Sequence, residues 1–124
     1  MTKDKELYYV EQRQAVITRD PDIELVTTGM TECIGMILKG RSLKSCVHFD
    51  GFVLYDKKTA FDNIKKIKDH MNQCSQEDYI TKIILFGGRE NSHNDKMLRD
   101  ALSYYFPNIK KEKYFNPHIS RNFF

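Results

Sequence analysis

The chain has 124 residues, of which 40% are apolar and 30% charged, a balance typical of one soluble globular domain and not of a disordered chain. Its 20 basic and 17 acidic residues give a net charge of +3, too small an excess to call for a nucleic-acid partner. No apolar run approaches the roughly 20 residues that cross a bilayer, so we expect no membrane contact. We expect one domain over residues 1–124, with a flexible tail from about residue 116.

The cysteine content and the first residues bear on the compartment. Cys33, Cys46 and Cys74 are odd in number and few, which argues against a disulfide framework and for reduced thiols. The N-terminal residues carry no apolar stretch of the kind found in secretory signals. We therefore expect a cytoplasmic protein, acting in its own cell or in a target cell.

The first third of the chain has the composition of β-strands. One strand is expected over Leu7 to Thr18, and Pro21 separates it from a second strand at about Glu24 to Thr28. Two more, Cys33 to Leu38 and Ser45 to Phe49, flank a turn-forming Lys-Gly-Arg-Ser sequence. This pattern predicts a β-hairpin.

A helix with one buried stripe is expected to begin near Thr59, a suitable N-cap with Asp62 in the first turn. Apolar residues recur there at helical spacing, namely Phe61, Ile64, Ile67 and Met71. The next apolar run, Ile80 to Phe86, predicts a strand that leads into Gly87 and Gly88.

A second helix is expected after a cap near Asn91 or Ser92, and Pro107 ends it. Its core-facing residues are Met97, Leu98, Ala101, Leu102 and Tyr105. A short strand follows over Ile109 to Phe115. Together these elements predict an α/β (α+β) sandwich, in which a mostly antiparallel sheet has helices on one face and a partly open second face.

The hairpin makes a testable prediction about two reactive side chains. A turn centred between Gly40 and Arg41 places Cys33 opposite His48 and Gly35 opposite Cys46. If the paired positions sum to 83 instead of 81, Cys33 and His48 stay on one face but lie on a diagonal. A sum of 82 places His48 on the opposite face. The register therefore decides whether the thiol and the imidazole can meet.

Alternation along both strands favours a shared face for the reactive pair. The apolar residues that helices would cover are Ile34, Met36, Leu38, Val47 and Phe49, whereas Cys33, Gly35, Cys46, His48 and Asp50 share the other face with Ile37. We expect Gly35 to open space beside the thiol, and Cys46 and Asp50 to line the same substrate cleft.

A cysteine beside a histidine is the minimal pair for nucleophilic acyl transfer, because the imidazole accepts the thiol proton and later gives it to a leaving amine. An adjacent imidazolium would keep Cys33 largely as thiolate. A third group usually orients the imidazole. Thr27 is the candidate, brought back by a second hairpin through residues 29–32, with Thr28, Asp50 and a backbone carbonyl as alternatives. Backbone N–H groups at Cys33 and in that turn are candidates for an oxyanion hole.

Two stretches resemble a known enzyme family. The segment VTTGMTECIGMIL at 26–38, followed by SCVHFDG at 45–51, resembles the nucleophile strand and the His-x-Asp-Gly strand of protein N-terminal asparagine amidohydrolases. The similarity continues through IILFGG at 83–88 and the helix after it, and covers about residues 24–106. The wider group includes chemoreceptor glutamine deamidases and toxins of the cytotoxic necrotizing factor type.

This resemblance implies a protein deamidase. In those enzymes a Cys-His pair, completed by a threonine or a carbonyl, hydrolyses a carboxamide through a thioester, without a cofactor. The threonine lies six residues before the cysteine, as Thr27 does here. The resemblance therefore implies that the catalytic residues are Cys33, His48 and Thr27. The implied substrate is a protein or peptide bearing Asn or Gln, with N-terminal Asn favoured. A transglutaminase would use the same thioester.

Two other interpretations come from different classes. Cys33, Cys46, His48 and Asp50 could together hold zinc, although the usual C-x-x-C pair is absent, and we expect no metal. Alternatively, the chain is a non-enzymatic adaptor that binds protein or RNA through the lysines at 110–113 and its aromatic tail.

Overall fold

The structure is a computed structural model that describes residues 6–29, 32–74 and 80–114. Its fold is α+β, with seven strands and two helices among these residues. The elements in chain order are β1 (Glu6–Tyr9), β2 (Ala15–Thr18), β3 (Ile23–Val26), β4 (Ile34–Gly40), β5 (Lys44–Phe49), α1 (Lys57–Cys74), β6 (Ile80–Gly87), α2 (His93–Tyr105) and β7 (Lys111–Tyr114). The expected Phe115 and the tail from residue 116 lie outside the described residues.

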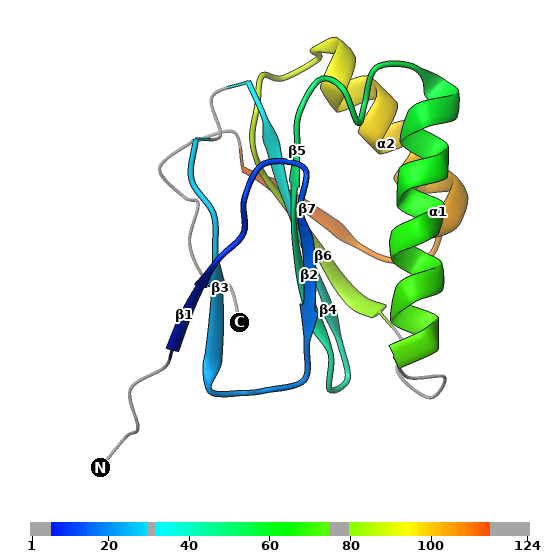
Figure 1. The fold of residues 1–124 in the computed structure, drawn as a ribbon. Helices are drawn as coiled ribbons and strands as arrows, with labels where there is room; N and C mark the ends of the chain where they lie inside the picture. Colours follow the sequence, from blue (N-terminus) through cyan, green and yellow to red (C-terminus); the bar gives the residue numbers. More distant parts are fainter. Residues whose placement is uncertain (1–5, 30–31, 75–79, 115–124) are drawn as a thin grey trace.

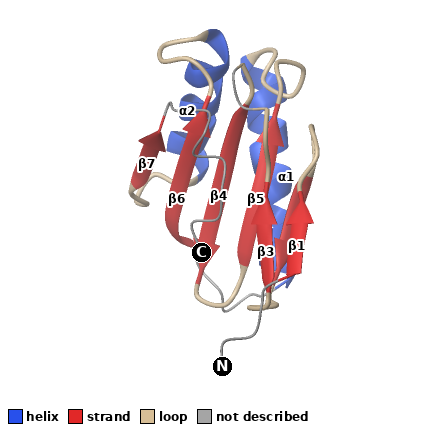
Figure 2. Cartoon of the chain, turned by 90° about the vertical axis from the view of Figure 1, so that its left-hand side faces the viewer, coloured by secondary structure: helices blue, strands red, loops and turns tan. Residues whose placement is uncertain are grey.

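The main sheet has the strand order β2-β5-β4-β6-β7, and only its β6–β7 pair is parallel. Both helices pack on one face of it, as the sequence predicted (Figure 1). A second, two-stranded sheet of parallel β1 and β3 lies on the other side. Viewed from that side, β1 and β3 lie over the β5 part of the main sheet (Figure 2). The face expected to be partly open is therefore partly covered by this ribbon.

Two hydrophobic cores follow from this layering. The larger core, between helices and sheet, buries the predicted apolar set, namely Ile34, Met36, Leu38, Val47 and Phe49, together with Ile64, Ile67 and Met71 of α1 and Leu98, Ala101 and Leu102 of α2. The smaller core, on the ribbon side, contains Val10, Leu25, Ile37, Cys46, Ile84 and Phe86. Ile37, the exception in the polar face, is buried because the ribbon covers it.

Three sequence-based expectations about local structure are wrong. The first expected strand is two strands, because residues 11–14 form a turn in which the Gln14 N–H donates to the Glu11 carbonyl and Arg13 adopts a left-handed φ of 63°. The first helix is capped by Asp56, whose carboxylate accepts from the Thr59 N–H at 2.7 Å. β3 pairs with β1 and not with β4, so the second hairpin does not form.

The antiparallel pairing places the start of β4 and the end of β5 at the same end of the main sheet. The end of β3 and the turn between β1 and β2 also lie at this end (Figure 1). Among the described residues, neither helix has the length and apolar character needed to cross a membrane.

Candidate active site

The observed hairpin register is the diagonal one. Gly35 faces His48 and Ile37 faces Cys46, so paired positions sum to 83. The reason is the turn, which is centred on Arg41 and Ser42, with the Gly40 N–H donating to the Leu43 carbonyl at 2.8 Å. The expected direct Cys33–His48 pair is therefore wrong, but both residues remain on one face. Diagonal neighbours lie roughly 7 Å apart, and among the described residues the structure shows no hydrogen bond between the Cys33 thiol and the His48 ring.

Cys33 precedes β4 by one residue, at the end of the sheet where β4 begins, and its side chain is partly exposed. It packs against the smaller core, on the ribbon side, which is also the side of His48. Gly88, after β6, has a left-handed φ of 73°, and a Cβ added there would lie 3.7 Å from the Cys33 carbonyl oxygen. The Gly-Gly turn therefore approaches the nucleophile strand closely.

His48 is oriented by the predicted threonine. Its Nδ1 lies 2.8 Å from Thr27 Oγ1, and the same hydroxyl donates to the Val10 carbonyl at 2.7 Å. Because a hydroxyl has only one proton, its bond to Val10 makes Nδ1–H the donor to Oγ1. Nε2 then carries no proton and is the acceptor that a base needs. Among the alternatives, Thr28 is exposed, and the carbonyl acts on the threonine instead of the ring.

The ionisation of His48 suits a base at neutral pH. Its side chain is buried, with 6% exposure. Burial lowers the pKa of His48 below its usual value, and the negative charge of Asp50 only partly opposes this shift. The imidazole is therefore neutral at pH 7.

Cys33 is a neutral thiol in the resting protein. Burial, then the negative charges of Asp50 and Glu32, raise the pKa of Cys33 above its usual value. The expected resting thiolate is therefore wrong, because the neighbouring imidazole is itself uncharged. A pair of neutral thiol and neutral imidazole can still react if Nε2 takes the proton as the sulfur attacks.

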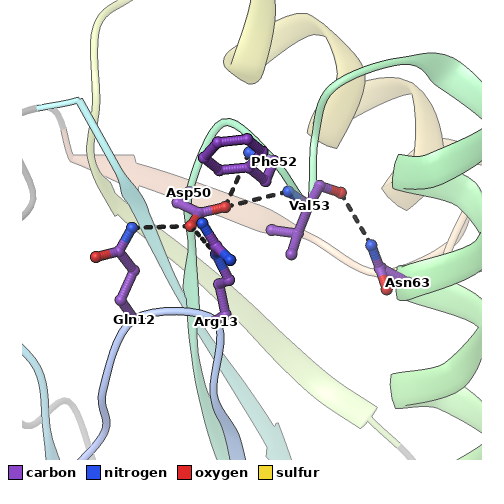
Figure 3. A network of polar contacts seen from close by, with 6 residues as sticks. All are labelled: Gln12, Arg13, Asp50, Phe52, Val53 and Asn63. Carbon is purple, nitrogen blue, oxygen red and sulfur yellow. Dashed lines mark hydrogen bonds and ion pairs between the residues drawn. The ribbon is translucent and has the colours of Figure 1, made fainter.

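Asp50 is the centre of a polar network that holds the turn before β2 (Figure 3). One carboxylate oxygen accepts from Gln12 Nε2 at 2.8 Å and from Arg13 Nε. The other accepts from the backbone N–H groups of Phe52 at 2.9 Å and Val53 at 3.1 Å. Burial alone would raise the pKa of Asp50, but these hydrogen bonds outweigh it and lower that pKa.

This network positions the histidine indirectly. The Arg13 N–H donates to the His48 carbonyl at 2.9 Å, and the His48 N–H donates to the Gln14 carbonyl at 3.0 Å. The turn is thereby fixed against the end of β5, which brings the Val10 carbonyl to Thr27. Sequence reasoning missed Val10, Gln12 and Arg13, because residues before an edge strand carry no motif.

The three expected substrate contacts are all buried. A Cβ at Gly35 would lie 2.3 Å from the Phe86 ring, so this ring, and no open space, covers Gly35. Cys46 is 1% exposed within the smaller core, where burial raises its pKa to about 12. Asp50 uses both oxygens within the protein. The expectation that this face forms an open cleft is therefore wrong, and Cys33 is its one partly exposed member among the five.

The site has one further pair that sequence reasoning missed. Glu32, directly before the nucleophile, forms an ion pair of 2.7 Å with Arg89 in the turn after β6. Both side chains are exposed, so the pair marks the rim of the site. As for the zinc alternative, no three His, Cys, Asp or Glu side chains converge as metal ligands within residues 6–29, 32–74 and 80–114.

The sequence matches no protein-family model and shows no significant similarity to a curated protein. The assignment of function therefore depends on the geometry and on the resemblance described above.

Proposed function

We propose that the protein is a cysteine-dependent deamidase that hydrolyses the side-chain amide of Asn or Gln in a protein or peptide. The observation that carries this proposal is the Val10–Thr27–His48 chain of hydrogen bonds, which fixes Nε2 as a proton acceptor on the face that Cys33 shares.

The reaction would proceed in two halves. Nε2 of His48 takes the Cys33 proton while the sulfur attacks the amide carbon, and the resulting imidazolium protonates the departing ammonia, leaving a thioester. Water, deprotonated by the same nitrogen, then attacks the thioester and releases the carboxylic acid and the thiol. Thr27 holds the ring throughout and stabilises its charged form, since Oγ1 accepts from Nδ1–H. The proposed oxyanion donors include residues 30 and 31, which lie outside the described residues.

The resemblance supports N-terminal Asn as the preferred substrate, and an amine in place of water would give the transglutaminase reaction from the same thioester.

The adaptor alternative has less support. Lys111 donates to the carbonyls of Phe106 and Ile109, and Lys113 pairs with buried Asp95, so two of its three lysines hold the protein together. All three cysteines are free thiols, which supports a cytoplasmic location.

The test is ammonia release from three peptides, carrying N-terminal Asn, N-terminal Gln or an internal amide. We expect the wild-type protein to release ammonia from at least one of them, and Cys33→Ser and His48→Ala to release none while keeping the wild-type circular dichroism. Equal release by either folded variant would reject the mechanism. Addition of a primary amine during the reaction distinguishes transglutamination, because it would give a heavier amide product.

A further inference from the structure

Asp50 lies between Cys33 and the side chain of Gln12. Ile34 faces Phe49 in the β4–β5 ladder, so the next residues along, Cys33 and Asp50, are neighbours across the two strands, with Cβ atoms roughly 5 Å apart. Gln12 comes from the other side of β5, in the turn before β2, and its Nε2 donates to Asp50 Oδ2 at 2.8 Å (Figure 3). The amide of Gln12 is thereby brought to the end of β5.

The two neighbours of Asp50 lie on the side of the sheet where the histidine is. Asp50 follows His48 by two residues on β5, so both side chains belong to the face that Cys33 shares. The negative charge of Asp50 contributes to the raised pKa of Cys33, after burial, which agrees with a short separation. The thiol, the imidazole and the amide of Gln12 therefore surround one region at this end of the sheet.

The side chain of Gln12 has a hydrogen-bond donor to spare. Because Asp50 is ionised and only accepts hydrogen bonds, the NH₂ group of Gln12 must be the end that faces it. That group has two N–H bonds, and within the described residues the second has no partner. Arg13 and the backbone of Phe52 hold the carboxylate in place, and Gln12 itself is exposed, so a substrate can reach its amide.

We propose that Gln12 is a catalytic residue, whose second N–H donates to the carbonyl oxygen of the substrate amide as that oxygen becomes negatively charged. The inference rests on the proposed function for the reaction. When the Cys33 sulfur bonds to the amide carbon, the π electrons of the carbonyl move to its oxygen. They return as the C–N bond breaks, and the departing ammonia takes its proton from His48. Gln12 transfers no proton and only stabilises the charge.

The distances fit this role. The amide of Gln12 is in contact with Asp50, whose strand is about one spacing, roughly 4.8 Å, from that of Cys33. A carbon bonded to the sulfur would project its oxygen into this interval, and an N–H···O bond spans roughly 2.9 Å of it. Gln12 adds a side-chain donor to the backbone N–H groups already considered for the oxyanion.

The first experiment removes the donor and keeps the length of the side chain. Gln12→Met should lower kcat for ammonia release about 10²-fold with KM nearly unchanged, because the charge on the oxygen develops only during the reaction. The matched control is Asn63→Ala, which also removes an amide that holds this loop, since Asn63 Nδ2 donates to the Val53 carbonyl at 3.0 Å (Figure 3). It should keep kcat within about threefold of the wild-type value.

Alkylation by iodoacetamide separates an oxyanion donor from a residue that only positions His48. This reaction needs the Cys33 thiol and its proton acceptor, but no negatively charged oxygen forms in it. We therefore expect Gln12→Met to be alkylated at the wild-type rate and with the wild-type pH dependence. If alkylation slows as much as ammonia release does, Gln12 acts through the histidine and the inference is wrong.

A peptide aldehyde, with the aldehyde in place of the side-chain amide, distinguishes failure of this proposal from failure of the proposed function. The Cys33 sulfur adds to it and gives a hemithioacetal, whose oxygen occupies the position of the oxyanion. If no amide peptide releases ammonia, the deamidase proposal fails, and the aldehyde alone then decides the role of Gln12. At least about tenfold weaker aldehyde binding by Gln12→Met, with equal binding of the amide peptide in the Cys33→Ser background, supports the donor. Equal affinity of the wild-type protein and Gln12→Met for the aldehyde would overturn it.

Discussion

Cys33 and Cys46 lie on the same side of neighbouring strands, yet only one of them has the surroundings of a nucleophile. Cys33 is partly exposed at the end of the sheet where β4 begins. Cys46 is 1% exposed, in the middle of β5 between Ile37 of β4 and the outer strand β2. Burial raises the pKa of both thiols, for Cys46 to about 12. A thiol on the correct face is therefore not sufficient, because access and a proton acceptor decide its chemistry.

The largest expected effect separates these two thiols. Cys33→Ser should lower the rate of ammonia release by at least about 10³-fold, because the sulfur forms the bond to the substrate. Cys46→Ser should leave the chemistry intact and instead lower the free energy of unfolding by about 1–3 kcal/mol, because it buries a hydroxyl in an apolar core. Steady-state kinetics and urea unfolding of both variants measure the two effects, and the reverse pattern would contradict the assignment.

The orientation of His48 gives the next largest effect. Thr27→Val removes the hydroxyl that accepts from Nδ1–H and should lower kcat about 10- to 100-fold, with KM nearly unchanged. Thr27→Ser retains the hydroxyl and should recover most of that loss. A threonine that merely packs would give the opposite result, since the isosteric valine would then be the more active of the two variants.

Gly35 and Phe86 test the smaller core beneath the thiol. Because a Cβ at Gly35 would lie 2.3 Å from the Phe86 ring, Gly35→Ala should destabilise the protein by about 1–3 kcal/mol. The double variant Gly35→Ala with Phe86→Leu should lose less than the sum of the two single changes, since the smaller side chain relieves the clash. Thermal unfolding measures both. Additive losses would mean that the ring does not cover Gly35.

The smallest expected effect is a loss of activity at acidic pH. Neutral His48 is the active form, and its pKa is lowered by burial, so kcat/KM should fall only as the pH drops through a value below 6.5. Because the Cys33 pKa is raised, alkylation of the free protein by iodoacetamide should still increase above pH 9. An alkylation rate that is already constant at pH 7 would indicate a preformed thiolate and contradict the neutral pair.

Much of the fold was predictable from local patterns. The alternation in β4 and β5 separated the two faces, and the spacing of Ile64, Ile67 and Met71 gave the buried stripe of α1. The register of the β4–β5 hairpin was not predictable. Moving its turn by one residue changes the sum of the paired residue numbers by two, and this leaves every side chain on the same face of the sheet. The ribbon was not predictable either, since the parallel pairing of β1 with β3 joins distant residues and leaves no local signal.

The candidate site shows the same division. Cys33, His48 and Thr27 could be selected by residue type and spacing, and the structure brings Thr27 to His48. It does so through the ribbon and not through the expected hairpin. Asp50 was noticed as a polar residue, but its role in fixing Arg13 depends on a turn conformation that the sequence does not reveal.

The central claim is that Cys33 becomes covalently bound to the substrate during amide hydrolysis. Acid quenching during turnover of an Asn peptide, followed by mass spectrometry of the whole protein and of its fragments, tests this directly. The account predicts a transient adduct on Cys33 with the mass of the peptide minus ammonia, present in the wild-type protein and absent from Cys33→Ser. Product formation with no adduct on Cys33, or with the peptide attached to another residue, would contradict it.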